Sequence, residues 1–207
     1  SKASDYLGNC YGYFGGGYDC CSDVLQLGYS TYYGGLAYMR IAVFFVGNRL
    51  MLDDGVAPAT YDYVLETYTF PEEVDLFDVG CMSMDLVSKV NDYDLLITVD
   101  AVDETGSEPG TVFRYEPYDI ARAAGARTSL HELRLADLFD AATMLGFSAE
   151  GLCFGMQIEN MEPVEFMEGL TPRVNEKVPF LAETIVAELV RRGCDISRKD
   201  GKPLQQL

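Results

Sequence analysis

From Met39 onward, short apolar runs alternate with longer stretches in which apolar residues recur every three or four positions. A short unbroken apolar run predicts a buried strand, and a period of about 3.6 residues predicts an amphipathic helix. Strands are therefore predicted at 41–46, 74–77, 94–99, 111–115 and 152–158, and helices at 57–67, 82–90, 130–145 and 174–191. Because helices separate the strands, we predict a three-layer α/β fold, with a doubly wound, mostly parallel sheet that carries helices on both faces.

The first 38 residues do not share this pattern. They hold eight of the fourteen tyrosines and eight of the twenty glycines, and turn-forming glycines interrupt every short apolar run. We therefore predict two parts, a Tyr/Gly-rich extension of unknown role at 1–38 and an α/β domain at 39–207.

The charge balance argues against two classes of partner. The chain has 33 acidic and 15 basic residues and a formal net charge of −18. Nucleic acids and anionic membranes bind clustered Lys and Arg, so neither is expected as a partner. No apolar run approaches the roughly 18 to 20 residues of a membrane span, and no signal peptide is recognisable. Six cysteines without a CxxC pair suit reduced thiols better than a disulfide frame or a zinc knuckle, so we expect a cytoplasmic protein.

Polar residues follow the predicted strands, and ligand sites in open α/β sheets gather at the carboxyl ends of strands. Asp53 and Asp54 come after the first strand, Asp100 ends the third, and the only histidine, His131, opens a predicted helix. A carboxylate at the end of a buried strand is costly unless a cation, a hydrogen-bond donor or a helix N-terminus stabilises it. Two carboxylates and an imidazole at one sheet edge suit a divalent metal that keeps open coordination positions.

Each of these residues also has a structural interpretation. One of the two adjacent acids suits the N-cap of the helix that begins near Pro58. Asp100 suits a hydrogen-bonding role as well as it suits a metal, and a single histidine near a helix start is commonly structural or exposed.

Other chemistries lack their motifs or match them poorly. The absence of GxGxxG, GxxxxGK[ST] and GxSxG argues against a dinucleotide site, a P-loop and a nucleophilic serine. A receiver-like phosphoacceptor domain is a rival, since it also carries paired acids after its first strand and an Asp at the end of a central strand. Here, however, GNRLML separates the acids from the strand, and the lysine expected directly after the last strand is missing near Gln157–Asn160.

Six short stretches, taken in order, carry a resemblance to a known family: GNRLMLDDGVAP, DVGCM, LLITVDAV, PGTV, SLHELRLADLF and GLTPRV. From about Met39 to Cys194 the chain resembles the [NiFe]-hydrogenase maturation endopeptidases, also known as peptidase family M52. The patterns GN-x-L-x-x-D-[DE]-G, D-x-G-[TC] and S-x-H-x-L-x-L are specific jointly, although none is specific alone. Residues 1–38 have no counterpart in that resemblance.

The resemblance implies a fold and an activity. Members of this family remove a short C-terminal extension from the precursor of a [NiFe]-hydrogenase large subunit after nickel has been inserted. They share a doubly wound α/β domain around a five-stranded, mostly parallel sheet. The family's metal-binding and catalytic positions fall on Asp54, Asp100 and His131, and Asp53 is then expected to support the turn and the helix start.

The resemblance also implies a substrate-binding motif and a source for the metal. The motif falls on Asp78, Val79, Gly80 and Cys81, and Cys81 replaces the usual threonine, which bears on substrate preference. Nickel, supplied by the substrate, is the expected metal, with another divalent ion in the same site as the second possibility. The alternative function is a non-catalytic module that binds nickel or the large subunit during hydrogenase assembly.

Overall fold

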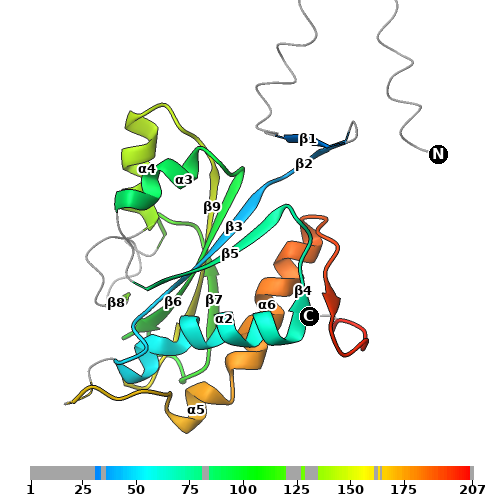
Figure 1. Ribbon diagram of the computed structural model, residues 1–207. Helices are drawn as coiled ribbons and strands as arrows, with labels where there is room; N and C mark the ends of the chain where they lie inside the picture. The colour runs from blue at the N-terminus through cyan, green and yellow to red at the C-terminus, as the bar shows by residue number, and fades with distance from the viewer. Residues whose placement is uncertain are drawn as a thin grey trace, which may run out of the picture.

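The computed structural model describes residues 31–33, 36–80, 84–119, 127–128, 135–160, 163 and 165–205. Five strands form the path of the main sheet in the order β5-β3-β6-β9-β7, and β8 pairs with β6 off this path (Figure 1). Their bounds are β3 Ile41–Val46, β5 Val74–Gly80, β6 Leu95–Asp103, β7 Val112–Tyr115, β8 Arg127–Thr128 and β9 Glu150–Gln157. Strand β3 is parallel to β5 and β6, β6 is parallel to β9, and only β7 among these five runs antiparallel to its neighbour. The predicted five-stranded, mostly parallel sheet is confirmed.

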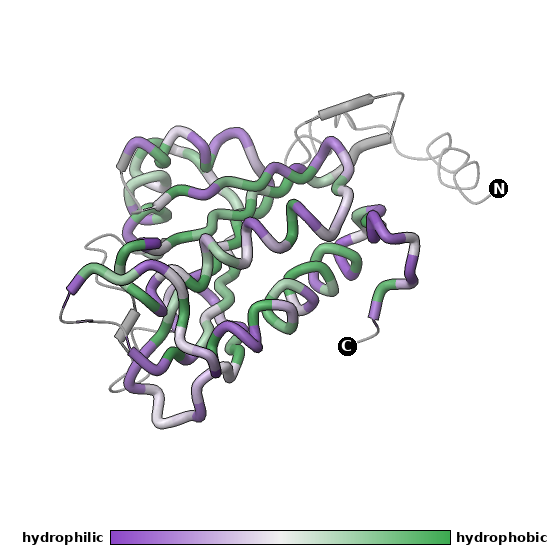
Figure 2. Tube along the Cα trace, turned by 60° about the horizontal axis from the view of Figure 1, so that its bottom comes forward, coloured by the Kyte–Doolittle hydropathy of each residue, from purple (hydrophilic) through white to green (hydrophobic). Residues whose placement is uncertain are grey.

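Helices cover both faces of this sheet. Helices α2 (Val56–Thr67) and α6 (Val178–Arg191) pack on one face, and α3 (Val87–Val90) and α4 (Leu135–Met144) pack on the other (Figure 1). Every residue of β3 is buried, and alternate residues of the strand join two separate apolar clusters, one under each helical layer. In Figure 2 the strands are coloured mostly as hydrophobic, whereas the helices carry both hydrophobic and hydrophilic residues. The three layers follow from strands that are apolar on both faces.

Short elements complete the described chain. They are β1 Thr31–Tyr33, β2 Leu36–Tyr38, the 3-10 helices η2 Leu52–Gly55 and η3 Met84–Leu86, β4 Tyr68–Thr69, α5 Pro172–Asn175 and β10 Ser197–Arg198. Strands β1 and β2 form an antiparallel pair within the predicted extension, where the sequence pattern indicated no regular element. Among the described residues, no helix is both long enough and apolar enough to cross a bilayer.

Several predicted element bounds were wrong. The helix predicted at 174–191 is two helices, α5 and α6, because Pro179 near the start of α6 has no N–H for an i−4 bond and its ring crowds the preceding turn. Strand β6 continues to Asp103 and does not end at position 99. Residues 82–83 and 130–134 of the predicted helices lie outside the described residues, which begin these helices at Met84 and Leu135.

Candidate active site

The two adjacent acids lie in a turn between β3 and α2. This turn is η2, and both Asp53 and Asp54 are buried, with 0% and 2% of their surface exposed. Leu52, at the start of η2, has a positive φ of 52°, and its backbone N–H donates to the carbonyl of Met167 at 2.9 Å. A non-glycine residue with positive φ is held by its surroundings at a cost in free energy, and such residues cluster at functional sites.

Asp53 joins its turn to two distant loops. Its Oδ1 accepts from the backbone N–H of Thr171 at 2.7 Å, and its Oδ2 accepts from the hydroxyl of the same threonine at 3.0 Å. Oδ2 also accepts from the backbone N–H groups of Glu159 and Asn160, just after β9, at 3.2 and 3.0 Å. The prediction that one of the paired acids caps α2 was wrong: Gly55 is the N-cap, and no side chain bonds there. Asp53 instead holds the turn against two loops, one just after β9 at Glu159 and Asn160 and the other at Thr171.

Asp54 is tied to the segment that directly follows β3. Its Oδ2 accepts from the backbone N–H of Asn48 at 2.8 Å. Gly47 lies so close that a Cβ atom there would be 2.1 Å from the carbonyl oxygen of Asp54. The N–H of Gly47 in turn donates to the carbonyl of Gly80 at the end of β5, at 2.9 Å. The position of Asp54 therefore depends on backbone contacts between the ends of β3 and β5.

Asp100 lies inside β6, not at its end as predicted. The residue is partly exposed and opposite Gly155 of β9, and its Oδ1 accepts from the N–H of Ala101 at 2.8 Å. The strand continues because β9 and β8 both pair with Val102 and hold it extended. Strand β3 ends sooner, so Asp100 still lies at the carboxyl edge with respect to β3.

Asp54 and Asp100 thus belong to the same edge of the sheet. Their strands, β3 and β6, are adjacent and parallel, with Phe45 opposite Val99, and η2 packs against β6. Among the residues that the structure describes, no three His, Cys, Asp or Glu side chains form a group that could hold a metal. His131, the third predicted ligand, lies outside the described residues, so the complete triple stays a prediction.

The predicted substrate-binding motif ends β5, on the other side of β3. Asp78 accepts from Arg49 Nη2 at 2.8 Å and from its Nε at 3.3 Å, so this carboxylate already has a cationic partner. Val79 is partly buried against the apolar cluster on the α3/α4 face. Gly80 has a positive φ of 57°, and Cys81 lies outside the described residues.

Arg49 was not singled out in the sequence, although it bridges two elements of the site. Besides Asp78 of β5, it donates to both carboxylate oxygens of Asp62 on α2, at 2.5 and 3.1 Å. These hydrogen bonds hold the pKa of Arg49 above its ordinary value. A single arginine within a motif of an otherwise strongly acidic chain was the available signal. Thr171, the partner of Asp53, carried no signal of its own.

Known proteins give consistent matches. The family model described as hydrogenase maturation protease matches residues 60–188. The hydrogenase expression/formation protein HoxM of Azotobacter vinelandii is 34% identical over 175 residues, which are 80% of this chain and 83% of that protein. The hydrogenase 2 maturation protease of Escherichia coli is 29% identical over 158 residues, 76% of this chain and 94% of that protein. The structure of the hydrogenase maturating endopeptidase HybD from E. coli has a TM-score of 0.69 at 27% identity, covering 79% of this chain and 100% of that one.

Proposed function

The chain belongs to the hydrogenase maturation protease family and is an endopeptidase of hydrogenase maturation, and we propose that it removes the C-terminal extension of a [NiFe]-hydrogenase large-subunit precursor after nickel insertion. The observation that carries this proposal is the placement of Asp54 and Asp100 at one edge of the sheet, on adjacent parallel strands. The same two residues were selected by their positions after the predicted strands and by the family motifs.

The donor set suits a divalent cation of intermediate softness. Carboxylate and imidazole ligands accept nickel among other first-row metals. In this proposal Asp54, Asp100 and His131 contact the nickel that the precursor brings, and a metal bound there polarises a carbonyl or lowers the pKa of a water. The chain itself supplies orientation: the N–H of Asn48 holds the Asp54 carboxylate, and Gly47 leaves room for the backbone carbonyl of Asp54.

The same residues explain why recognition and hydrolysis act together in this proposal. The motif from Asp78 to Cys81 is the proposed substrate-binding segment, and its Gly80 accepts the hydrogen bond from Gly47. One short backbone segment, residues 47–49, therefore contacts both the metal-binding acid and the substrate-binding motif. A precursor that shifts this motif also acts on the position of Asp54.

A cytoplasmic location is part of the proposal. Cys153 and Cys194 are buried and free, not joined in a disulfide, and free buried thiols suit a reducing compartment.

The test is mass spectrometry of the precursor, nickel-loaded and nickel-free, before and after incubation with this protein. We expect the loaded precursor to lose its C-terminal extension and the nickel-free precursor to stay intact. Asp54→Asn, Asp100→Asn and His131→Gln should each stop trimming. Asp54→Asn is preferred to an alanine because the amide oxygen still accepts from Asn48 and so keeps the turn folded.

Asp92→Asn is the matched control, because Asp92 is exposed and precedes the amino end of β6, at the opposite edge of the sheet. This variant should trim the precursor at the wild-type rate. Normal trimming by the Asp54 or His131 variant would exclude the assigned site. Wild-type protein that binds loaded precursor without shortening it would favour the non-catalytic alternative.

A further inference from the structure

Three large apolar side chains are exposed beside the turn that carries Asp54. The exposed fractions are 45% for Leu50, 78% for Phe166 and 50% for Met167. The backbone links them, since the N–H of Met167 donates to the carbonyl of Leu50 at 2.9 Å. The two segments that carry these exposed side chains are therefore adjacent, and exposed apolar patches on soluble proteins mark contact sites for partners. We call Leu50, Phe166 and Met167 the apolar platform.

The platform is held in place by the turn itself. Met51 and Met167 form a β-bridge, and the carbonyl of Met167 accepts from Leu52. Asp53 fastens the chain before the platform at Glu159 and Asn160, and after it at Thr171. Phe166 is therefore exposed on an anchored segment, which the buried carboxylate of Asp53 and the backbone bridge between Met51 and Met167 hold in place.

The charge around the platform is negative. Glu165 and Glu168, which flank Phe166 and Met167 in the sequence, are both exposed. No Lys or Arg occurs from 159 to 172. Arg49, on the neighbouring segment, is already paired with Asp62 and Asp78. A hollow of about 270 Å³ is lined by residues that neighbour the platform in sequence and by part of α2: Arg49, Gly55, Ala59, Glu168, Gly169 and Leu170.

From these observations we propose that the apolar platform is the docking surface for the precursor, and that it receives an apolar side chain flanked by Lys or Arg. The inference rests on the proposed function for the identity of the partner. The apolar contact supplies affinity, and Glu165 and Glu168 complement the basic flanks and discriminate against acidic segments. Leu50 of the platform precedes Asp53 by three positions in the chain, so a segment bound at the platform lies beside the turn that carries Asp54.

The test compares matched variants in two measurements, the affinity for nickel-loaded precursor and the steady-state rate of trimming. The apolar pair is Phe166→Ser against Met144→Ser. Met144 is 88% exposed at the end of α4, which leads to the amino end of β9, at the opposite edge of the sheet (Figure 1). We expect Phe166→Ser to raise the dissociation constant and KM about tenfold with kcat nearly unchanged, as for an interface anchor, and Met144→Ser to change neither.

The charge pair is Glu165→Gln/Glu168→Gln against Glu66→Gln/Asp92→Asn. Both double variants remove two exposed negative charges, and only the first removes them beside the platform. We expect the first to weaken precursor binding and to flatten its dependence on salt, and the second to behave as the wild type.

The outcomes separate this inference from the proposed function. If wild-type protein trims the precursor and Phe166→Ser binds it equally well, the docking surface is wrong and the proposed function stands. If wild-type protein never trims, the proposed function fails, and the binding measurement still tests the platform. If light scattering shows a dimer that Phe166→Ser dissociates without loss of precursor affinity, the platform is a contact between copies of this chain and the docking proposal is overturned.

Discussion

Asp53 and Thr171 are 118 positions apart in the chain and are joined by two hydrogen bonds, one from the backbone N–H and one from the hydroxyl of the threonine. The carboxylate that receives them is fully buried and accepts two further backbone N–H groups. Hydrogen bonds to a buried charge contribute more than neutral ones, and losing the charge leaves several donors unsatisfied. The first prediction concerns this carboxylate.

Asp53→Asn should lower the free energy of unfolding by about 2–4 kcal/mol. The side-chain NH2 group of the asparagine is a donor, and it would face N–H and hydroxyl groups of the loops that are also donors. Urea denaturation measures the change. Thr171→Val removes only the hydroxyl and should cost about 1 kcal/mol. Equal stability of Asp53→Asn and the wild type would show that the buried carboxylate does not hold the loops together.

Gly47 is the second test of the turn. Its φ is 153°, and an added Cβ would lie 2.1 Å from the carbonyl oxygen of Asp54, a backbone atom with little freedom to move. We predict that Gly47→Ala displaces the turn, lowers stability by more than about 2 kcal/mol and abolishes trimming. Thermal unfolding and the precursor assay measure the two effects.

Gly80→Ala is the matched control for Gly47. Gly80 also has a positive φ, 57°, but among the described residues nothing lies within 4 Å of an added Cβ. The substitution should therefore cost only the intrinsic strain of a left-handed alanine, about 1–2 kcal/mol. Comparable losses at the two glycines would mean that backbone conformation, not the contact with Asp54, determines the outcome.

Arg49 should affect substrate use more than stability. Its side chain is 46% exposed, and the side chains of Asp62 and Asp78 are 53% and 29% exposed, so solvent screens both ion pairs. Arg49→Ala should change the free energy of unfolding by no more than about 1 kcal/mol. The proposed substrate-binding motif then loses its side-chain contact with the segment after β3 and keeps only the backbone bond from Gly47, so we expect a higher KM for the precursor.

Asp62→Asn separates the two contacts of Arg49. It weakens the pair with α2 and keeps the pair with Asp78, so it should leave KM unchanged. A rise in KM for Asp62→Asn as large as that for Arg49→Ala would contradict a specific role of the Asp78 contact.

The layers of this fold could be predicted from the sequence because they depend on local periodicity. Strand β3 is a run of six apolar residues, a length typical of a strand that is buried on both faces and too short for a buried helix. The bounds that failed depend on partners distant in sequence. Strand β6 reaches Asp103 because β8 and β9 continue to pair with it beyond position 99. The residues after position 99 do not themselves indicate that these strands pair there.

The candidate site divides in the same way. The placement of Asp54 and Asp100 at one edge of the sheet could be predicted, because adjacent parallel strands bring the residues that follow them to the same edge. The role of Asp53 could not be predicted, because its donors come from the loop after β9 and from the loop before α5. Three of these four donors are backbone N–H groups, which any sequence supplies. Arg49 was missed because its two carboxylate partners come from separate elements, β5 and α2.

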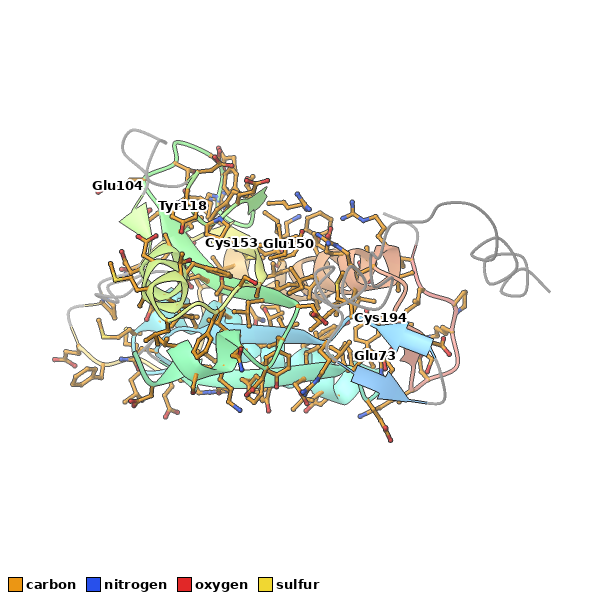
Figure 3. The ribbon with its side chains drawn as sticks, turned by 90° about the horizontal axis from the view of Figure 1, so that it is seen from above. Glu73, Glu104, Tyr118, Glu150, Cys153 and Cys194 are labelled. Carbon is orange, nitrogen blue, oxygen red and sulfur yellow. The ribbon has the colours of Figure 1, made fainter. Side chains whose placement is uncertain are left out.

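The last prediction concerns alkaline pH and Cys153. This thiol lies in the sheet, in the apolar cluster on the α3/α4 face (Figure 3). Burial, with a smaller contribution from the charge of Asp100, raises its pKa to about 12. The unfolded chain loses this proton near pH 9, whereas the folded chain keeps it, so folding is favoured fully below pH 9 and progressively less as the pH rises toward 12.

We therefore expect the free energy of unfolding to fall between pH 9 and 12 in the wild type and to fall less steeply in Cys153→Ala. Cys194→Ala should reduce the fall of the free energy of unfolding with pH by a smaller amount, because burial raises the pKa of Cys194 only to about 11. Tyr115, whose pKa burial also raises, accounts for part of the slope that remains. Urea midpoints at pH 8, 9.5 and 10.5 measure the three slopes. Identical slopes in the wild type and Cys153→Ala would mean that the buried thiol does not determine alkaline stability.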